Sequence, residues 1–169
     1  MVDGLWSTAC IPRQDLFASY RIELDFQKAQ DVTRTEYYAM DATCAEAVAT
    51  LQYRGDYELI VTGRDFTYAI DFSLNEQSLV ALHSSAQQRW EEAGFCGQQL
   101  WPLTVAQHPL TFDPGNCTAV GPVPLNHLNL VSINRGFSLN FGSDLAHDNE
   151  RPVDVVISPE LVFLSQPSP

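Results

Sequence analysis

The sequence is poor in positive charge and has no long hydrophobic run. Its lysines and arginines number 9, with Lys28 the only lysine, against 21 acidic residues, so the net charge is −12. A chain this acidic repels the phosphates of nucleic acids and the anionic surface of a membrane. No apolar stretch approaches the ~20 residues of a membrane-spanning helix. We therefore expect no nucleic acid partner and no membrane span.

The sequence also lacks the short motifs that mark common catalytic, metal and phosphate sites. It contains no CxxC pair, no HExxH, no GxSxG and no glycine-rich phosphate loop. The adjacent Glu91 and Glu92 are a poor catalytic pair, because neighbouring residues on a helix point in different directions. We expect no metal, no cofactor and no catalytic residue, and we favour a protein that is not an enzyme.

The length and composition fit one globular domain. The chain has 169 residues, of which 45% are hydrophobic. A chain of this size buries roughly two-thirds of its unfolded surface, which is enough for a core. We expect a single domain over residues 1–169, with a frayed tail at residues 165–169.

Four cysteines, Cys10, Cys44, Cys96 and Cys117, indicate disulfides rather than a metal site. They allow three pairings. We favour Cys10–Cys44 with Cys96–Cys117, because each pair flanks its own block of chain. Disulfides persist in oxidising compartments, so we expect an exported protein. A reduced protein with four buried thiols is the alternative.

Alternating side chains predict many short strands. Tyr20, Ile22, Leu24 and Phe26 alternate with polar residues, which is typical of a strand with one buried face. A hairpin turn is expected at residues 54–56, where Gly55 is central. The further predicted strands cover residues 32–40, 47–53, 57–62, 66–72, 125–133, 137–141, 153–157 and 161–164, with a short one near 110–112.

One helix and one irregular loop interrupt the strands. Residues 78–93 contain no glycine or proline and place Leu79, Leu82, Ala86 and Trp90 at helical spacing. Ser78 is the expected N-cap, and Gly94 follows the predicted end. Residues 95–124 hold five prolines and two cysteines, so we expect a loop fixed by a disulfide.

These elements predict an all-β fold: a single antiparallel barrel of about eight strands, with the helix and stapled loop of residues 78–124 inserted mid-chain. A sandwich has a similar strand count, but it usually needs Greek-key crossings. Short links between successive strands indicate a meander, which favours the barrel.

The aromatic side chains of the predicted strands should gather on one face of the sheet. An eight-stranded barrel has just enough interior to be filled by side chains or to hold one small ligand. The sequence therefore leaves two alternatives for the barrel interior: a filled core and a ligand cavity. The candidate lining residues are Tyr20, Phe26, Phe66, Tyr68, Phe72, Phe137 and Phe141.

Gly4-Leu5-Trp6 resembles the G-x-W motif that opens the first strand of lipocalins and related calycins. The resemblance implies a lipocalin-like barrel in which Trp6 plugs the closed end. It also implies an arginine packed over that tryptophan, for which Arg151 and Arg135 are the candidates. The second lipocalin motif, T-D-Y, is missing, since the similar Gly55-Asp56-Tyr57 comes too early in the chain.

A wider pattern is similar to a group of bacterial exported, lipoprotein-like proteins without a settled function. The resemblance implies a secreted protein, or one in the periplasm or outer envelope of a bacterium. The matching elements are Trp6 with Cys10, Cys44, Gly55-Asp56-Tyr57, Phe95-Cys96-Gly97, Trp101, Cys117, Phe141-Gly142 and Arg151-Pro152.

Three functions fit these observations. The first is a non-enzymatic binding protein that holds a small apolar or amphipathic ligand in the barrel. The second is a protein–protein interaction module or inhibitor that uses the loop of residues 95–124. The third is an enzyme with a cavity site, which needs a buried titratable group with a shifted pKa. The histidines to check first are His83, His108 and His127.

Overall fold

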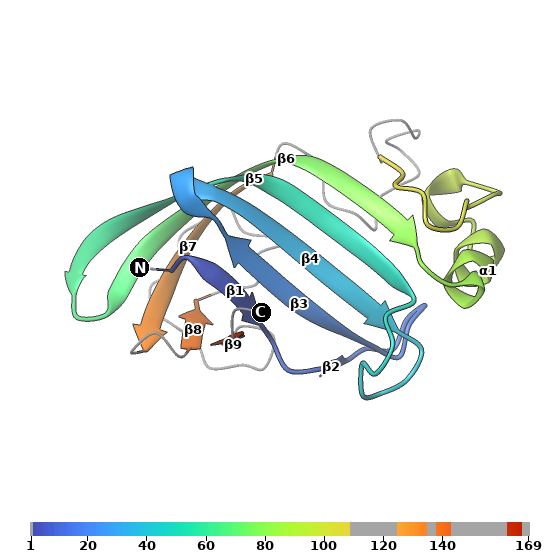
Figure 1. Cartoon of the computed structure of the whole chain (residues 1–169), viewed down its shortest axis with the longest axis horizontal. Helices are drawn as coiled ribbons and strands as arrows, with labels where there is room; N and C mark the ends of the chain where they lie inside the picture. Colours follow the sequence, from blue (N-terminus) through green and yellow to red (C-terminus); the bar gives the residue numbers. More distant parts are fainter. Residues whose placement is uncertain (1, 109–124, 135–137, 143–161, 167–169) are drawn as a thin grey trace.

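The computed structural model describes residues 2–108, 125–134, 138–142 and 162–166. Within these residues the chain forms strands, one α-helix and two 3₁₀ turns (Figure 1). The helical elements are η1 (Lys28–Gln30), α1 (Ser84–Glu92) and η2 (Phe95–Gly97). The strands are β1 (Gly4–Ser7), β2 (Ile11–Pro12), β3 (Ser19–Phe26), β4 (Asp31–Ala39), β5 (Ala49–Arg64), β6 (Thr67–Ala81), β7 (Leu125–Asn134), β8 (Ser138–Phe141) and β9 (Val162–Ser165).

The strands close into an antiparallel barrel. From β3 to β9 each strand pairs with the next along the chain, and β1 pairs with both β3 and β9. Eight strands of the described chain therefore form a ring, and the short β2 extends it by pairing with the start of β3. The predicted all-β barrel is confirmed, and it is compatible with the lipocalin-like fold that Gly4-Leu5-Trp6 implies.

Strands β3 and β4 show how the sequence places one face inward. Ile22, Leu24 and Phe26 are buried, and the residues between them are only partly buried. The register pairs Phe26 with Val32, so the same face continues onto β4. This period of two is what the alternation of residues 20–26 predicts.

The predicted turn at residues 54–56 is wrong, because β5 runs through it without a break. The pairing of β5 with β6 shifts register between Arg54 and Gly55. A Cβ on Gly55 would lie 2.0 Å from the backbone oxygen of Ser73. The absence of a side chain at Gly55 thus lets the backbones of β5 and β6 approach closely at a bulge, and Gly55 does not form a turn. The true hairpin lies between Arg64 and Thr67.

The predicted helix start is also wrong. Strand β6 continues to Ala81, with Leu79 opposite Leu51 and Ala81 opposite Ala49. The helix α1 begins at Ser84, and His83 rather than Ser78 is its N-cap. The predicted end is confirmed, since Gly94 follows the helix in the left-handed conformation.

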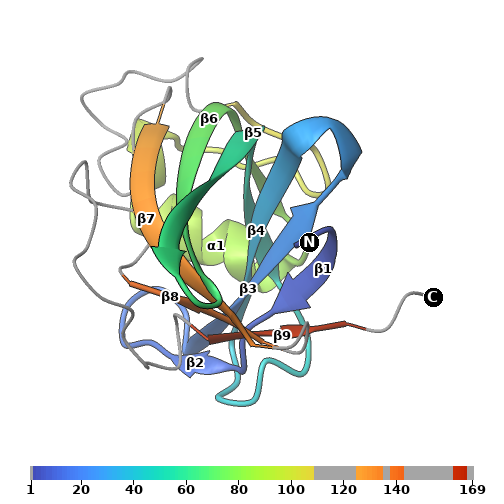
Figure 2. The same ribbon diagram turned by 90° about the vertical axis from the view of Figure 1, so that its left-hand side faces the viewer.

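The helix α1 covers one end of the barrel. Figure 2 looks along the barrel and shows α1 behind the ring of strands. Ala86 and Trp90 are the buried residues of the helix. The chain then returns along β6 through bridges between Leu79 and Gln107 and between Ala81 and Leu103. The predicted strands at 110–112 and 153–157, and most of the predicted tail, lie outside the described residues.

The Cys10–Cys44 disulfide is confirmed, with a Cα–Cα distance of 5.7 Å. It joins the link before β2 to the loop after β4. In that loop the hydroxyl and backbone N–H of Thr43 donate to Asp41, which lowers the pKa of Asp41 to about 2. Cys96 is not a free thiol. Its predicted partner, Cys117, lies outside the described residues, so that pairing stays a prediction.

Within the described residues, no helix is both long and apolar enough to cross a membrane.

Gly55→Ala is expected to lower the free energy of unfolding by about 3 kcal/mol, because the added methyl group meets the backbone of β6. Gly63→Asn is the control. Gly63 has a φ of +79° with open space around it, and asparagine tolerates that conformation. We expect the control to cost less than about 1 kcal/mol. Urea denaturation measures both, and equal losses would contradict the role of Gly55.

Candidate functional site

The middle of the barrel is occupied by aromatic rings that contact one another. Phe26 and Phe72 have ring centroids 6.2 Å apart, and Phe72 and Phe141 are 6.3 Å apart. Phe141 in turn meets the edge of Phe163 at 5.4 Å. All four side chains are buried. Three of the predicted lining residues, Phe26, Phe72 and Phe141, thus pack as core in the middle of the barrel.

The other predicted lining residues lie in different places. Tyr20 and Tyr68 are partly buried and pack against the core. Phe66 occupies the turn between β5 and β6 with a positive φ, and it is 68% exposed. It does not share the inner face, because the turn interrupts the alternation just before β6. Phe137 lies outside the described residues.

Trp6 is buried beside β3, where it is paired with Leu24. Its indole Nε1 donates to the backbone oxygen of Val2 at 2.6 Å. Both candidate arginines, Arg151 and Arg135, lie outside the described residues. The role of Trp6 as a plug under an arginine stays a prediction.

A buried polar network lies inside the barrel on β4. Arg34, Glu36 and Tyr38 share the inward face with Val32. The Arg34 Nη2 lies 2.8 Å from Glu36 Oε1, and the Tyr38 hydroxyl donates to Glu36 Oε2. Burial, and then the negative charge of Glu36, raise the pKa of Tyr38 far above its usual range. Tyr38 therefore stays protonated near neutral pH, which makes it a poor general base.

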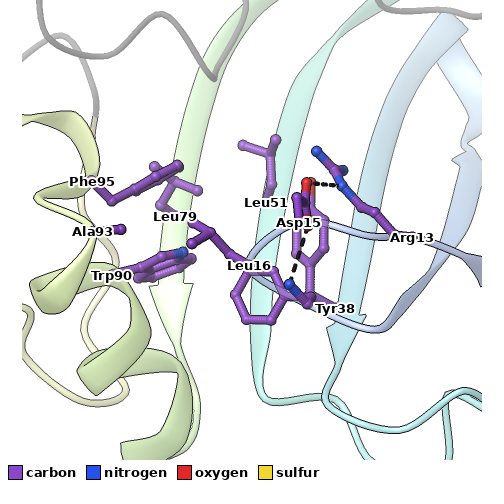
Figure 3. Close-up of a pocket in the computed structure, with 10 residues that line it drawn as sticks. Arg13, Asp15, Leu16, Tyr38, Leu51, Leu79, Trp90, Ala93 and Phe95 are labelled. Carbon is purple, nitrogen blue, oxygen red and sulfur yellow. Dashed lines mark hydrogen bonds and ion pairs between the residues drawn. The ribbon is translucent and has the colours of Figure 1, made fainter.

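A cavity of about 350 Å³ lies at the barrel mouth beneath α1 (Figure 3). Three separate parts of the chain supply its walls: the link between β2 and β3, the ends of β4, β5 and β6, and the end of α1 with the turn after it. Most of the lining side chains are apolar or aromatic. They are Arg13, Asp15, Leu16, Phe17, Tyr38, Leu51, Leu79, Trp90, Ala93 and Phe95.

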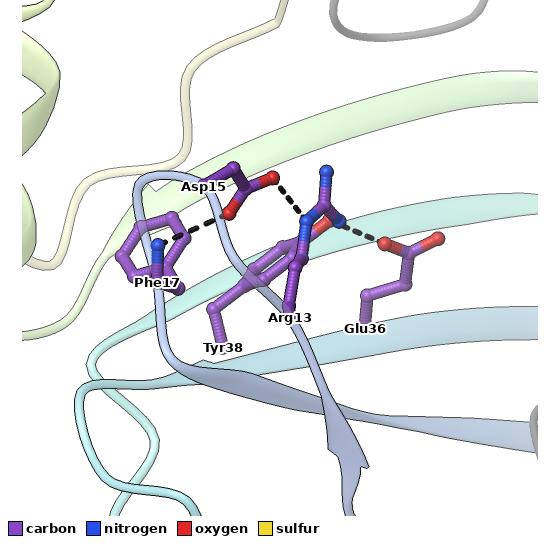
Figure 4. Close-up of polar contacts among 5 residues, drawn as sticks. All are labelled: Arg13, Asp15, Phe17, Glu36 and Tyr38. Atoms are coloured by element: carbon purple, nitrogen blue, oxygen red, sulfur yellow. Dashed lines mark hydrogen bonds and ion pairs between the residues drawn. The ribbon is translucent and has the colours of Figure 1, made fainter.

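The polar part of the cavity is a balanced pair of charges (Figure 4). Arg13 Nε is ion-paired with Asp15, and the other oxygen of Asp15 accepts from the backbone N–H of Phe17 at 3.1 Å. The Arg13 guanidinium also lies 5.5 Å from the ring centroids of both Tyr20 and Tyr38. These contacts fix the side chain over the aromatic rings at the rim.

The side of the cavity formed by α1 is an aromatic cluster. Trp90 stacks on Phe95 at 5.3 Å, and its centroid lies 4.5 Å from that of Trp101. Phe17 reaches the edge of Trp90 at 6.2 Å and stacks on Tyr38 at 5.0 Å. This cluster joins the helix to the barrel mouth.

The predicted chemical candidates are dispersed. His83 is exposed and caps α1, and His108 bonds the backbone oxygen of Gln77. The side chain of His127 is outside the described part. Glu91 accepts from the backbone of Trp101, whereas Glu92 accepts from Gln88. No group of three or more metal-binding side chains occurs among the residues that the structure describes.

No motif in the sequence links the residues that line the mouth cavity. They come from segments that are far apart along the chain, and only the barrel register brings them together. Trp90 is the exception, because its helical spacing with Ala86 indicates a buried face of a helix. Arg34 and Glu36 were missed, since charged residues are almost never expected inside.

Comparison with models of known protein families finds none that matches this chain, and comparison with curated proteins finds no relative.

Glu36→Gln is expected to lower the free energy of unfolding by about 3–5 kcal/mol, because it leaves the Arg34 charge buried without its carboxylate. The double variant Arg34→Met with Glu36→Leu should lose less than Glu36→Gln does alone.

Asp15→Asn is the control for this ion pair, since Arg13 and Asp15 are both about 40% exposed. We expect it to cost less than about 1 kcal/mol. Urea denaturation separates the three variants. A loss of under about 1 kcal/mol for Glu36→Gln would show that the pair in the barrel does not hold the fold.

Proposed function

We propose that this protein is a non-enzymatic binding protein that holds a small apolar or amphipathic ligand at the mouth of its barrel. The observation that carries this proposal is the cavity of about 350 Å³ with mainly apolar and aromatic walls. Its volume falls in the usual range for small-molecule sites, roughly 300–1,000 Å³. The site lies at the mouth of the barrel, and Phe26, Phe72 and Phe141 in the middle of the barrel do not line it.

The walls supply both parts that an amphipathic ligand needs. Leu16, Leu51 and Leu79 offer apolar surface, and Trp90 and Phe95 offer flat ring faces. Polar groups are few and placed at defined points, as in other small-molecule sites.

The proposed place of action is outside the cytoplasm: secreted, or in the periplasm or outer envelope of a bacterium. The Cys10–Cys44 disulfide supports it, because such bonds persist in oxidising compartments. The lipoprotein-like resemblance points to the same compartment. Cell fractionation checks it, and recovery of the protein with reduced thiols in the cytosol would contradict it.

Leu16→Phe is expected to weaken the binding of cumene by about tenfold or more, because the larger side chain fills the cavity. Cumene is a suitable probe, since it is small, apolar and uncharged. Leu100→Phe is the matched control, because Leu100 is exposed and does not line the cavity. Equilibrium dialysis measures both. Failure of the native protein to bind apolar probes, or equal binding by both variants, would contradict the proposal.

A protein–protein interaction module is the second candidate, and one feature of the loop favours it. Within residues 95–108, Leu100 is 79% exposed, Leu103 40% and Val105 49%. Clustered exposed apolar side chains mark docking surfaces. The rest of the predicted loop, residues 109–124, lies outside the described residues.

Serine at these three positions should release a partner that the native protein retains from envelope extract, because the apolar contact is lost. Serine at Val61 and Phe66, which are also exposed, should leave the retention unchanged. If the native protein retains no specific partner, or if both variants behave alike, this second function is wrong.

A further inference from the structure

One donor in the wall of the mouth cavity has no hydrogen-bond partner. Trp90 is 1% exposed, and its indole Nε1 makes no hydrogen bond in the structure. The equivalent nitrogen of Trp6, by contrast, donates to a backbone oxygen. Buried donors are rarely left unpaired, because each lost hydrogen bond destabilises the protein. The unpaired N–H of Trp90 is therefore free to donate to an acceptor that a ligand brings.

The position of this nitrogen relates it to the cavity. In Figure 3 the indole nitrogen of Trp90 lies on the ring edge that is turned toward Leu16. Both residues line the cavity. Phe95 stacks on the Trp90 ring at 5.3 Å, and the tilted ring of Trp101 lies 4.5 Å away. The N–H edge is the polar part of the indole, and it is turned toward the cavity wall at Leu16, where a ligand's acceptor would meet it.

The charges of the cavity argue against an anionic ligand. Its described lining includes one cation, Arg13, and one anion, Asp15, and these two are ion-paired. The guanidinium also rests against Tyr20 and Tyr38. A carboxylate ligand would have to displace Asp15 and would approach the buried Glu36, which bonds Tyr38. An uncharged acceptor avoids both costs.

We propose that the mouth cavity selects an uncharged apolar molecule with one hydrogen-bond acceptor, such as a ketone or ester, and that Trp90 Nε1 donates to this acceptor. The inference rests on the proposed binding function and adds the class of ligand. Trp90 is the residue that determines specificity, while the leucine and phenylalanine side chains supply apolar contact.

Three probes of nearly equal shape test the inference. Cumene, acetophenone and benzoate share a phenyl ring and differ in the two atoms on the attached carbon: two methyl groups, a carbonyl oxygen with one methyl group, or a carboxylate. Equilibrium dialysis gives the affinity of each. The informative quantity is the ratio of the affinity for acetophenone to that for cumene, because it cancels changes in general apolar binding.

Trp90→Phe keeps an aromatic ring and removes the N–H. We expect this variant to lower the ratio by about tenfold, the loss of one hydrogen bond to a buried donor. Trp101→Phe is the matched control. It makes the same change 4.5 Å away in a residue that does not line the cavity, and should leave the ratio unchanged. Retained binding of cumene by Trp90→Phe shows that the variant is folded and its cavity intact.

The outcomes separate the inference from the function on which it rests. An unchanged ratio in Trp90→Phe, with cumene still bound, overturns the role of Trp90 and leaves the binding function standing. Benzoate bound more tightly than acetophenone, with the preference lost in Arg13→Gln, overturns the choice of an uncharged ligand. No binding of any probe by the native protein overturns the proposed function itself.

Discussion

Strand β1 closes the barrel, because its four residues pair with β3 on one side and two of them, Trp6 and Ser7, pair with β9 on the other. The ring depends on this short segment. Strands β3 and β9 stand at the two ends of the meander, and β1 is the strand that joins them. The backbone N–H of Ile22 donates to the hydroxyl of Thr8, which extends the contact beyond the end of β1. Closure also removes exposed strand edges, where aggregation begins.

A closed ring fixes which side chains point inward, and the interior must then accommodate them. Over most of its length the inward faces carry aromatic and aliphatic residues, which fill the space. On β4 the same face carries Arg34, Glu36 and Tyr38, and Glu36 bonds both of the others. Toward α1 the packing is incomplete, and the mouth cavity begins where Tyr38 ends the polar network. The cavity is therefore set by the register of the barrel.

The alternation of residues 20–26 predicted β3 because each inward residue there is plainly apolar. The sequence pattern predicted less where one residue type suits two kinds of local structure. Gly55 between polar neighbours has the composition of a turn, yet its role is a bulge that only the partner strand β6 reveals. Leu79 satisfies both a helical and a strand period, and the pairing with Leu51 decides between them. The mouth cavity had no local signal, because its walls meet only after the ring closes.

The Cys10–Cys44 disulfide has a consequence for the segment that forms one wall of the cavity. Residues 13–17 of that wall lie between Cys10 and Ser19. Cys10 is held covalently, and the Ser19 hydroxyl donates to the backbone oxygen of Asp41 at 2.5 Å in the loop that carries Cys44. Both ends of the segment are thus tied to one loop. Its conformational entropy is lost when the disulfide forms rather than when a ligand arrives, so the wall is preorganised and less ordering opposes binding.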